Sequence, residues 1–173
     1  MKIDFVPVRE DHLDIVREIY NYYVLNTTAT YHLHEISREE VYEIIPVNHS
    51  KYKSFLIYDD SEPVGYCYLG QYKKSEAYDR TAEVTIYLKH GHQGKGIGLQ
   101  TLNFLEKCAL DRNILVLIGI ISGDNEGSIR LFEKAGYEKC AHFRRVGEKF
   151  GKILDVVAYQ KIIDNRISAG TKS

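Results

Sequence analysis

The chain contains no tryptophan and only three cysteines among its 173 residues. Cys67, Cys108 and Cys140 have neither a paired nor a zinc-binding spacing, which argues against a disulfide framework or a cysteine-rich metal site. No apolar run approaches the length of a membrane span, and Lys2 is not followed by the apolar core of a secretory signal. We therefore expect a cytoplasmic protein without a membrane partner.

Neither sign of charge dominates, because 23 lysines and arginines nearly balance 24 aspartates and glutamates, and the formal net charge is -1. Such a balance gives no strong field for nucleic acid or an anionic membrane, so we expect neither as a partner. The hydrophobic content of 44% is ordinary for a globular protein. The length fits one domain, which we assign to residues 1–162, with a polar tail at 163–173.

Hydrophobic periodicity and turn residues predict an alternating order of strands and helices. Asp11 is expected to cap the first helix. Ser37 and Glu40 form a capping-box pattern for the second helix, which Pro46 should end. The apolar run 115–121 predicts a fully buried central strand. Strands are expected at 3–9, 54–58, 64–69, 82–88, 115–121, 137–145 and 153–160, with helices between them. This order predicts a mixed α/β sheet.

The stretch 93–98, Gln-Gly-Lys-Gly-Ile-Gly, is the strongest chemical signal in the chain. It leads into a helix predicted over 99–112, and the N-terminus of a helix offers free N–H groups and partial positive charge to a phosphate. Lys95 is not followed by Ser or Thr as in a P-loop, and the third glycine falls one position early for a dinucleotide fingerprint. An ordinary strand-to-helix turn remains the alternative.

Two motifs in order resemble the GNAT superfamily of acyl-CoA N-acetyltransferases. The spacing of Gln93, Gly96 and Gly98 is similar to that family's pyrophosphate loop, and residues 125–137 are similar to its Asn-x-x-Ser helix ending in Gly and an aromatic residue. The resemblance narrows to the phosphinothricin-type acetyltransferases through four further segments, at residues 19–21, 27–30, 82–83 and 146–156.

The resemblance implies a mixed, mostly antiparallel sheet of about seven strands flanked by about four helices. In that fold the strand before the glycine turn and the apolar strand after the helix separate, and the pantetheine arm of acetyl-CoA enters between them. Acetyl-CoA is the implied cosubstrate, no metal is implied, and a homodimer is the implied assembly. The expected cofactor-binding residues are Ile86, Tyr87, Leu88, Gln93, Gly94, Lys95, Gly96, Ile97, Gly98, Asn125 and Ser128.

Glu83 is the candidate general base, because acetyl transfer to an amine requires removal of an ammonium proton. It precedes the cofactor turn on the same strand, and the resemblance assigns this role to the matching glutamate. The alternative is an exposed glutamate near a lysine. Many superfamily members have a tyrosine as general acid where this chain has Phe132. Tyr159, His142 or solvent would then protonate the thiolate, or no acid is needed, since a thiol pKa is near 8.5.

The acceptor site is expected at Tyr78, Arg80 and the loop Thr27 to Tyr31, with Tyr31 as its main contact, where the resemblance implies substrate contacts. The guanidinium of Arg80 can hold a carboxylate or phosphinate through paired donors. The spacings His32-x-His34 and His90-x-His92 lack a third ligand, so no metal site is expected.

These residues lead to one expected function with several alternatives. The expected function is acetyl-CoA-dependent acetylation of the α-amine of a small amino-acid-like acceptor, such as phosphinothricin, methionine sulfoximine or methionine sulfone, by direct transfer. A polyamine, an aminoglycoside or a protein N-terminus is the alternative acceptor. A non-catalytic acyl-CoA-binding sensor is the alternative outside enzymes.

Overall fold

The computed structural model describes residues 1–165, so most of the tail expected at 163–173 lies outside the described residues. The strands are β1 (Ile3–Pro7), β2 (Lys53–Asp59), β3 (Glu62–Gln71), β4 (Thr81–Leu88), β5 (Val116–Ser122), β6 (Glu138–Lys149) and β7 (Lys152–Ile162). The helices are α1 (Leu13–Asn26), α2 (Arg38–Ile44), α3 (Ile97–Leu110) and α4 (Glu126–Lys134), with 3-10 turns at Glu10–His12 and Glu76–Tyr78.

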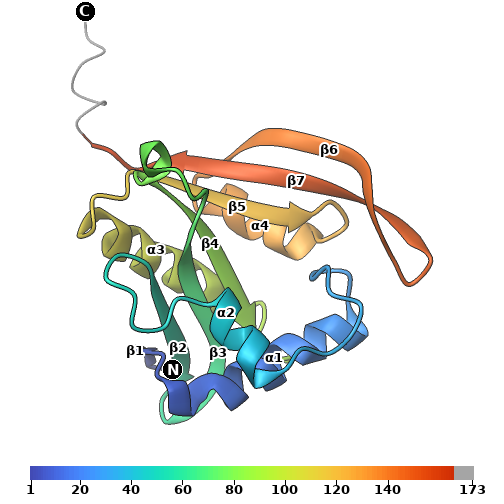
Figure 1. Ribbon diagram of the computed structural model, residues 1–173, viewed down its shortest axis with the longest axis horizontal. Helices are drawn as coiled ribbons and strands as arrows, with labels where there is room; N and C mark the ends of the chain where they lie inside the picture. Colours follow the sequence, from blue (N-terminus) through green and yellow to red (C-terminus); the bar gives the residue numbers. More distant parts are fainter. Residues whose placement is uncertain (166–173) are drawn as a thin grey trace, which may run out of the picture.

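The seven strands form one sheet in the order β1-β2-β3-β4-β5-β7-β6 (Figure 1). All neighbours are antiparallel except β4 and β5, which α3 connects in parallel. One apolar cluster joins α1 and α2 to one face of the sheet, and a second joins α3 and α4 to the other face. The predicted fold class, a mixed and mostly antiparallel sheet with four flanking helices, is confirmed.

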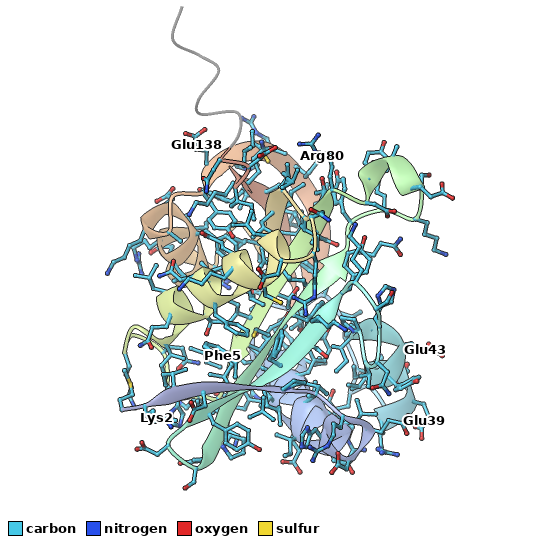
Figure 2. All side chains as sticks on the ribbon, turned by 90° about the vertical axis from the view of Figure 1, so that its left-hand side faces the viewer. Lys2, Phe5, Glu39, Glu43, Arg80 and Glu138 are labelled. Carbon is cyan, nitrogen blue, oxygen red and sulfur yellow. The ribbon has the colours of Figure 1, made fainter. Side chains whose placement is uncertain are left out.

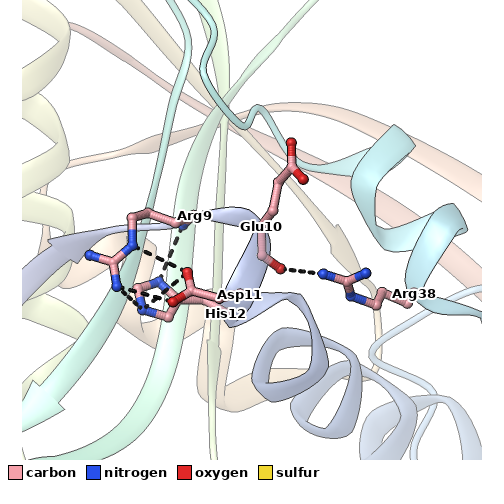
Figure 3. A network of polar contacts seen from close by, with 5 residues as sticks. All are labelled: Arg9, Glu10, Asp11, His12 and Arg38. Atoms are coloured by element: carbon pink, nitrogen blue, oxygen red, sulfur yellow. Dashed lines mark hydrogen bonds and ion pairs between the residues drawn. The ribbon is translucent and has the colours of Figure 1, made fainter.

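The prediction that Asp11 caps the first helix is wrong. The Asp11 carboxylate instead accepts two hydrogen bonds of 3.2 Å from the Arg9 guanidinium, and residues 10–12 form a 3-10 turn (Figure 3). The ring of His12 accepts from the Arg9 backbone N–H at 3.2 Å, and Arg38 donates to the carbonyl of Glu10 at 2.7 Å. Helix α1 therefore begins at residue 13, with His12 as its N-cap, one position later than the capping pattern predicts.

The second helix begins as predicted. The Ser37 side chain accepts from the Glu40 N–H at 3.2 Å, while the Glu40 carboxylate accepts from the Ser37 N–H at 2.6 Å. Helix α2 ends at Ile44, ahead of Pro46. The capping box and the proline boundary are therefore both confirmed.

The prediction that the apolar run 115–121 is a fully buried central strand is wrong at one end. β5 does lie in the middle of the sheet, but Ile120 is 41% exposed. The reason is that β4 pairs with β5 only through Thr81, Ala82 and Glu83. Beyond Glu83 the two strands separate, so one edge of β5 has no neighbouring strand.

The last two strands form a long hairpin that extends beyond the body of the molecule (Figure 1). The predicted first strand of this hairpin ends at Arg145, but β6 continues to Lys149. A change of register between Phe143 and Gly147 accounts for the difference, since Arg145 has a positive φ of 58° and interrupts the pairing without ending the strand.

Candidate active site

A cleft of about 800 Å³ lies where β4 and β5 separate, and it continues between the N-terminal parts of α3 and α4. This volume lies within the range of small-molecule and cofactor sites. The cleft is lined by Tyr23, Thr27, Thr28, Ala29, Val84, Thr85, Ile86, Tyr87, Leu88, Gln93, Gly94, Gly96, Gly98, Leu99, Ile120, Ile121, Ser122, Asp124, Asn125, Gly127, Ser128, Arg130, Leu131, Phe132 and Lys134. Of the residues predicted to bind the cofactor, only Lys95 and Ile97 do not line it.

The glycine loop forms the end of the cleft at the N-terminus of α3. Gly94 and Gly96 have φ values of 75° and 82°, which a residue with a Cβ adopts only with strain. Gly96 is the N-cap of α3, so the N–H groups of the first turn have no partner within the helix. No heavy atom lies within 4 Å of the Cβ positions that Gly94 and Gly96 lack. The loop therefore leaves its backbone open to a phosphate.

Gly98 has a different role from the other two glycines. A Cβ at Gly98 would lie 2.8 Å from Cδ2 of Leu131 on α4. The residue thus allows close packing of α3 against α4, while its neighbour Ile97 is fully buried in the core. Gln93 also has a structural role. Its side chain donates to the Tyr23 hydroxyl at 2.9 Å and accepts from the Gly91 N–H at 3.0 Å, so it connects the loop to α1.

One wall of the cleft is the edge of β4 that faces β5. From residue 84 onward this edge has no neighbouring strand, so its backbone groups are not paired with β5. An extended chain with amide groups can pair with such an edge as an added strand would. The opposite wall includes Asn125, whose side chain accepts from the Ser128 N–H at 3.2 Å and caps α4. A strand edge followed by a helix N-terminus fits a molecule with amides at one end and phosphates further along. Acetyl-CoA meets that description.

Phe132 lines the cleft and lies directly on β5. A Cβ at Gly119 would be 2.3 Å from Cε1 of the Phe132 ring, so the strand needs glycine at this position. The two alternative acids are elsewhere: the Tyr159 hydroxyl donates to Glu133 at 3.0 Å, and His142 contacts Asp155 at 2.7 Å. Neither of them lines the cleft.

Glu83 is the last residue of β4 that pairs with β5. It is half-buried, and burial raises the pKa of its carboxyl. Every second residue of a strand lies on the same face of the sheet. Glu83 therefore shares a face with Thr85 and Tyr87, the face that packs against α1 and α2. The side chain of Tyr68 lies near Glu83. Burial raises the pKa of Tyr68, and the negative charge of Glu83 adds to this rise. A half-buried carboxyl beside the cleft has the properties of a proton acceptor.

Of the predicted acceptor site, residues 27–29 of the loop line the cleft, but Tyr31, Tyr78 and Arg80 do not. Tyr31 is 46% exposed, and its partial burial raises the pKa of its hydroxyl, while a hydrogen bond with Ser122 opposes this. Tyr78 makes an edge contact with Tyr72. Arg80 lies 3.9 Å from the carboxylate of Asp164. In Figure 2, Arg80 and Glu138 lie at the same end of the molecule, far from Glu39 and Glu43 of α2.

Several residues of the cleft were not predicted from the sequence. Tyr23 donates to the carbonyl of Leu88 at 2.5 Å. Asp124 accepts a hydrogen bond of 2.7 Å from Thr28, a residue of the predicted substrate loop. Arg130 and Lys134 line the cleft from α4, and their i, i+4 spacing indicates in the sequence that they share one helix face. The Tyr23 and Asp124 contacts join segments far apart in the chain, so no local pattern could reveal them.

In residues 1–165 no three His, Cys, Asp or Glu side chains are grouped so that they could hold a metal ion. None of the helices in this range combines the length and apolar composition needed to cross a membrane.

Residues 6–158 match the family described as Acetyltransferase (GNAT) domain. The chain is 29% identical over 153 residues to the L-methionine sulfoximine/L-methionine sulfone acetyltransferase of Pseudomonas paraeruginosa, covering 87% of this chain and 89% of that protein. It is 26% identical over 159 residues to the phosphinothricin N-acetyltransferase of Streptomyces viridochromogenes, covering 92% and 87%.

A similar solved structure is the GNAT superfamily phosphinothricin acetyltransferase of Sinorhizobium meliloti in complex with AcCoA. Its TM-score is 0.86 at 27% identity, with 94% of this chain and 89% of that chain covered. The family match spans most of the chain and agrees with the separated strands and the glycine loop. The protein described here therefore belongs to the GNAT family of acetyltransferases.

Proposed function

We propose that this protein is an acetyl-CoA-dependent N-acetyltransferase that acts on the α-amine of a small amino-acid-like acceptor. The observation that carries the proposal is Glu83, a half-buried carboxyl with a raised pKa at the point where the cleft opens. The names of the relatives from Pseudomonas paraeruginosa and Streptomyces viridochromogenes support the acceptor class. Methionine sulfoximine, methionine sulfone and phosphinothricin are the acceptors to test first.

Acetyl-CoA, when bound, supplies an acetyl group activated as a thioester. The free edge of β4 at residues 86–88 would bind its amides, and the loop 93–98 would bind its pyrophosphate, because these backbone groups line the cleft. Asn125 and Ser128 would contact it from the α4 side. A backbone N–H of β4 would also stabilise negative charge on the thioester oxygen during attack.

The protein's part in the reaction is to produce a free amine and hold it in position. Glu83 accepts a proton from the acceptor ammonium, directly or through a water, and burial favours this by raising the proton affinity of the carboxylate. Phe132 cannot donate a proton to the leaving thiolate. Because the thiolate is a good leaving group, solvent protonation is sufficient.

We further propose a cytoplasmic homodimer. The projecting β6–β7 hairpin supports this assembly because five large apolar side chains on it are more than half exposed: Phe143, Val146, Phe150, Ile153 and Ile162. Exposed apolar surface is a feature of protein interfaces.

The test measures thiol release from acetyl-CoA by the purified protein with a panel of amines. The panel contains phosphinothricin, methionine sulfoximine, methionine sulfone, spermidine, an aminoglycoside and a short peptide. Release with the first three alone is expected. Release only with spermidine, aminoglycoside or peptide would retain the enzyme class and refute the acceptor.

Glu83→Gln tests the proposed base in the same assay. It should bind acetyl-CoA as the wild type does but lower kcat at neutral pH by about 100-fold or more, the typical contribution of a general base. Glu138→Gln is the matched control, since Glu138 is an exposed glutamate on β6 and should leave kcat unchanged. Wild-type turnover in Glu83→Gln would exclude Glu83 from the mechanism.

A further inference from the structure

Lys149 is an unusual lysine, because only 2% of its surface is exposed. A buried ammonium normally lies beside a carboxylate that offsets the cost of removing the charge from water. Here burial lowers the pKa of Lys149, and within residues 1–165 its ammonium forms no ion pair with a carboxylate. The side chain is therefore held in place without the ion pair that would usually stabilise it.

The ammonium of Lys149 binds the loop that follows α1. It donates to the backbone carbonyl of Thr30 at 3.0 Å and to the Thr30 hydroxyl at 3.3 Å. The two residues are 119 positions apart in the chain, so the contact joins the N-terminal half of the protein to the projecting hairpin. Thr30 is itself only 2% exposed, which makes this a protected contact and not a surface one.

The backbone next to Lys149 has a costly conformation. β6 ends at Lys149 and β7 begins at Lys152, so the chain turns through Phe150 and Gly151 alone. Both have positive φ values, 52° and 71°, and this conformation is unfavourable for phenylalanine. The Phe150 ring lies 5.1 Å from the Lys149 ammonium. The tight turn thus fixes where the end of β6 can lie.

Residues 27–31, which we call the acceptor loop, have no helix or strand to hold them. Thr27, Thr28 and Ala29 nevertheless line the cleft. Thr28 is bound to Asp124 on the β5 side, and Thr30 is bound to Lys149 on the hairpin side. The loop is therefore bound at two points by side chains of the C-terminal half, Asp124 and Lys149. Because the loop lines the cleft, we expect a change at either side chain to alter the shape of the cleft.

We propose that Lys149 is a positioning residue for the acceptor site, which acts by holding Thr30 and with it the acceptor loop against the cleft. The proposal rests on the proposed function, since it assumes that an amine acceptor enters beside this loop. Lys149 does not touch the cleft itself. Its loss should therefore alter acceptor use and leave cofactor binding unchanged.

The test compares Lys149→Met, which keeps the length of the side chain and removes the charge, with Arg144→Met, an exposed cation on the same strand. Two quantities are measured: hydrogen exchange of the amides of residues 27–31, and steady-state kinetics with methionine sulfone. Lys149→Met should speed exchange of the loop about tenfold, because the Thr30 carbonyl loses its charged donor. It should lower kcat/KM for methionine sulfone about tenfold, with the Kd for acetyl-CoA unchanged; Arg144→Met should change none of these.

Unchanged exchange in a folded Lys149→Met variant would overturn the proposal, as would a parallel loss of acetyl-CoA affinity. Thr30→Val, which removes only the hydroxyl acceptor, serves if Lys149→Met does not fold, and it should give a smaller change in the same direction. Absence of turnover by the wild type with every acceptor would refute the proposed function. The exchange measurement would then still decide whether Lys149 holds the loop.

Discussion

Gly119→Ala is the substitution whose effect the structure defines most closely. Gly119 lies in β5, and the Phe132 ring of α4 covers it. An added Cβ would lie 2.3 Å from Cε1, 2.7 Å from Cζ and 2.9 Å from Cδ1 of that ring. All three distances are shorter than a carbon–carbon contact allows. The ring must therefore move, and since Phe132 lines the cleft, it moves either into the cleft or together with α4.

Overpacking of this kind costs about 1–3 kcal/mol in the free energy of unfolding. For a chain of this length, each kcal/mol lowers Tm by about 2–4 °C, so the expected loss is about 2–12 °C. The Kd for acetyl-CoA should rise as well, because the displaced ring narrows the space between β5 and α4.

Thermal unfolding and acetyl-CoA titration of Gly119→Ala, Phe132→Leu and the double variant check this reasoning. The smaller leucine should relieve the clash, so the double variant should be more stable than the sum of the single effects predicts. Gly147→Ala is the control, since Gly147 does not line the cleft and the nearest atom to its added Cβ is 3.7 Å away. A Gly119→Ala protein with wild-type Tm and Kd would refute the account of Phe132 packing.

Two further predictions concern charge. Arg130→Ala and Lys134→Ala should raise KM for acetyl-CoA but not for acetyl-dephospho-CoA, because these two cations line the cleft and can bind the phosphate that the dephospho form lacks; equal effects on both substrates would contradict this. Glu83→Gln should be more stable than the wild type at pH 8, while the two converge in acid. Burial raises the pKa of Glu83, so the folded state binds this proton more tightly than the unfolded state, and stability falls as pH rises through the raised pKa. Thermal unfolding across pH checks this, and equal Tm values at pH 8 would contradict it.

The order of strands and helices was predictable because most boundaries depend on local chemistry. The Ser37–Glu40 capping box and the Asn125 cap involve residues three apart, and a local pattern records them directly. The cap predicted at Asp11 failed although it is local, because Arg9 binds the same carboxylate and favours a 3-10 turn.

The candidate site was predictable where backbone geometry requires glycine, as at Gly94 and Gly96. It was not predictable where strands separate, because the apolar run of β5 does not indicate that β4 leaves it after Glu83. The contacts of Thr28 with Asp124 and of Thr30 with Lys149 depend on the folded positions of distant segments. Periodicity in the sequence carries no information on such contacts.

The short pairing between β4 and β5 also determines how the molecule can bend. Only three residue pairs join strands β1–β4 to strands β5–β7 within the sheet, and they lie at one end of β4. Any change in the angle between the two groups of strands is a rotation about this short seam. Displacement in a rotation grows with distance from the axis, so within β4 and β5 the residues that would move furthest are Leu88 and Ser122. Glu83 lies at the seam itself, and its carboxyl would keep its position while the cleft widens or narrows around it.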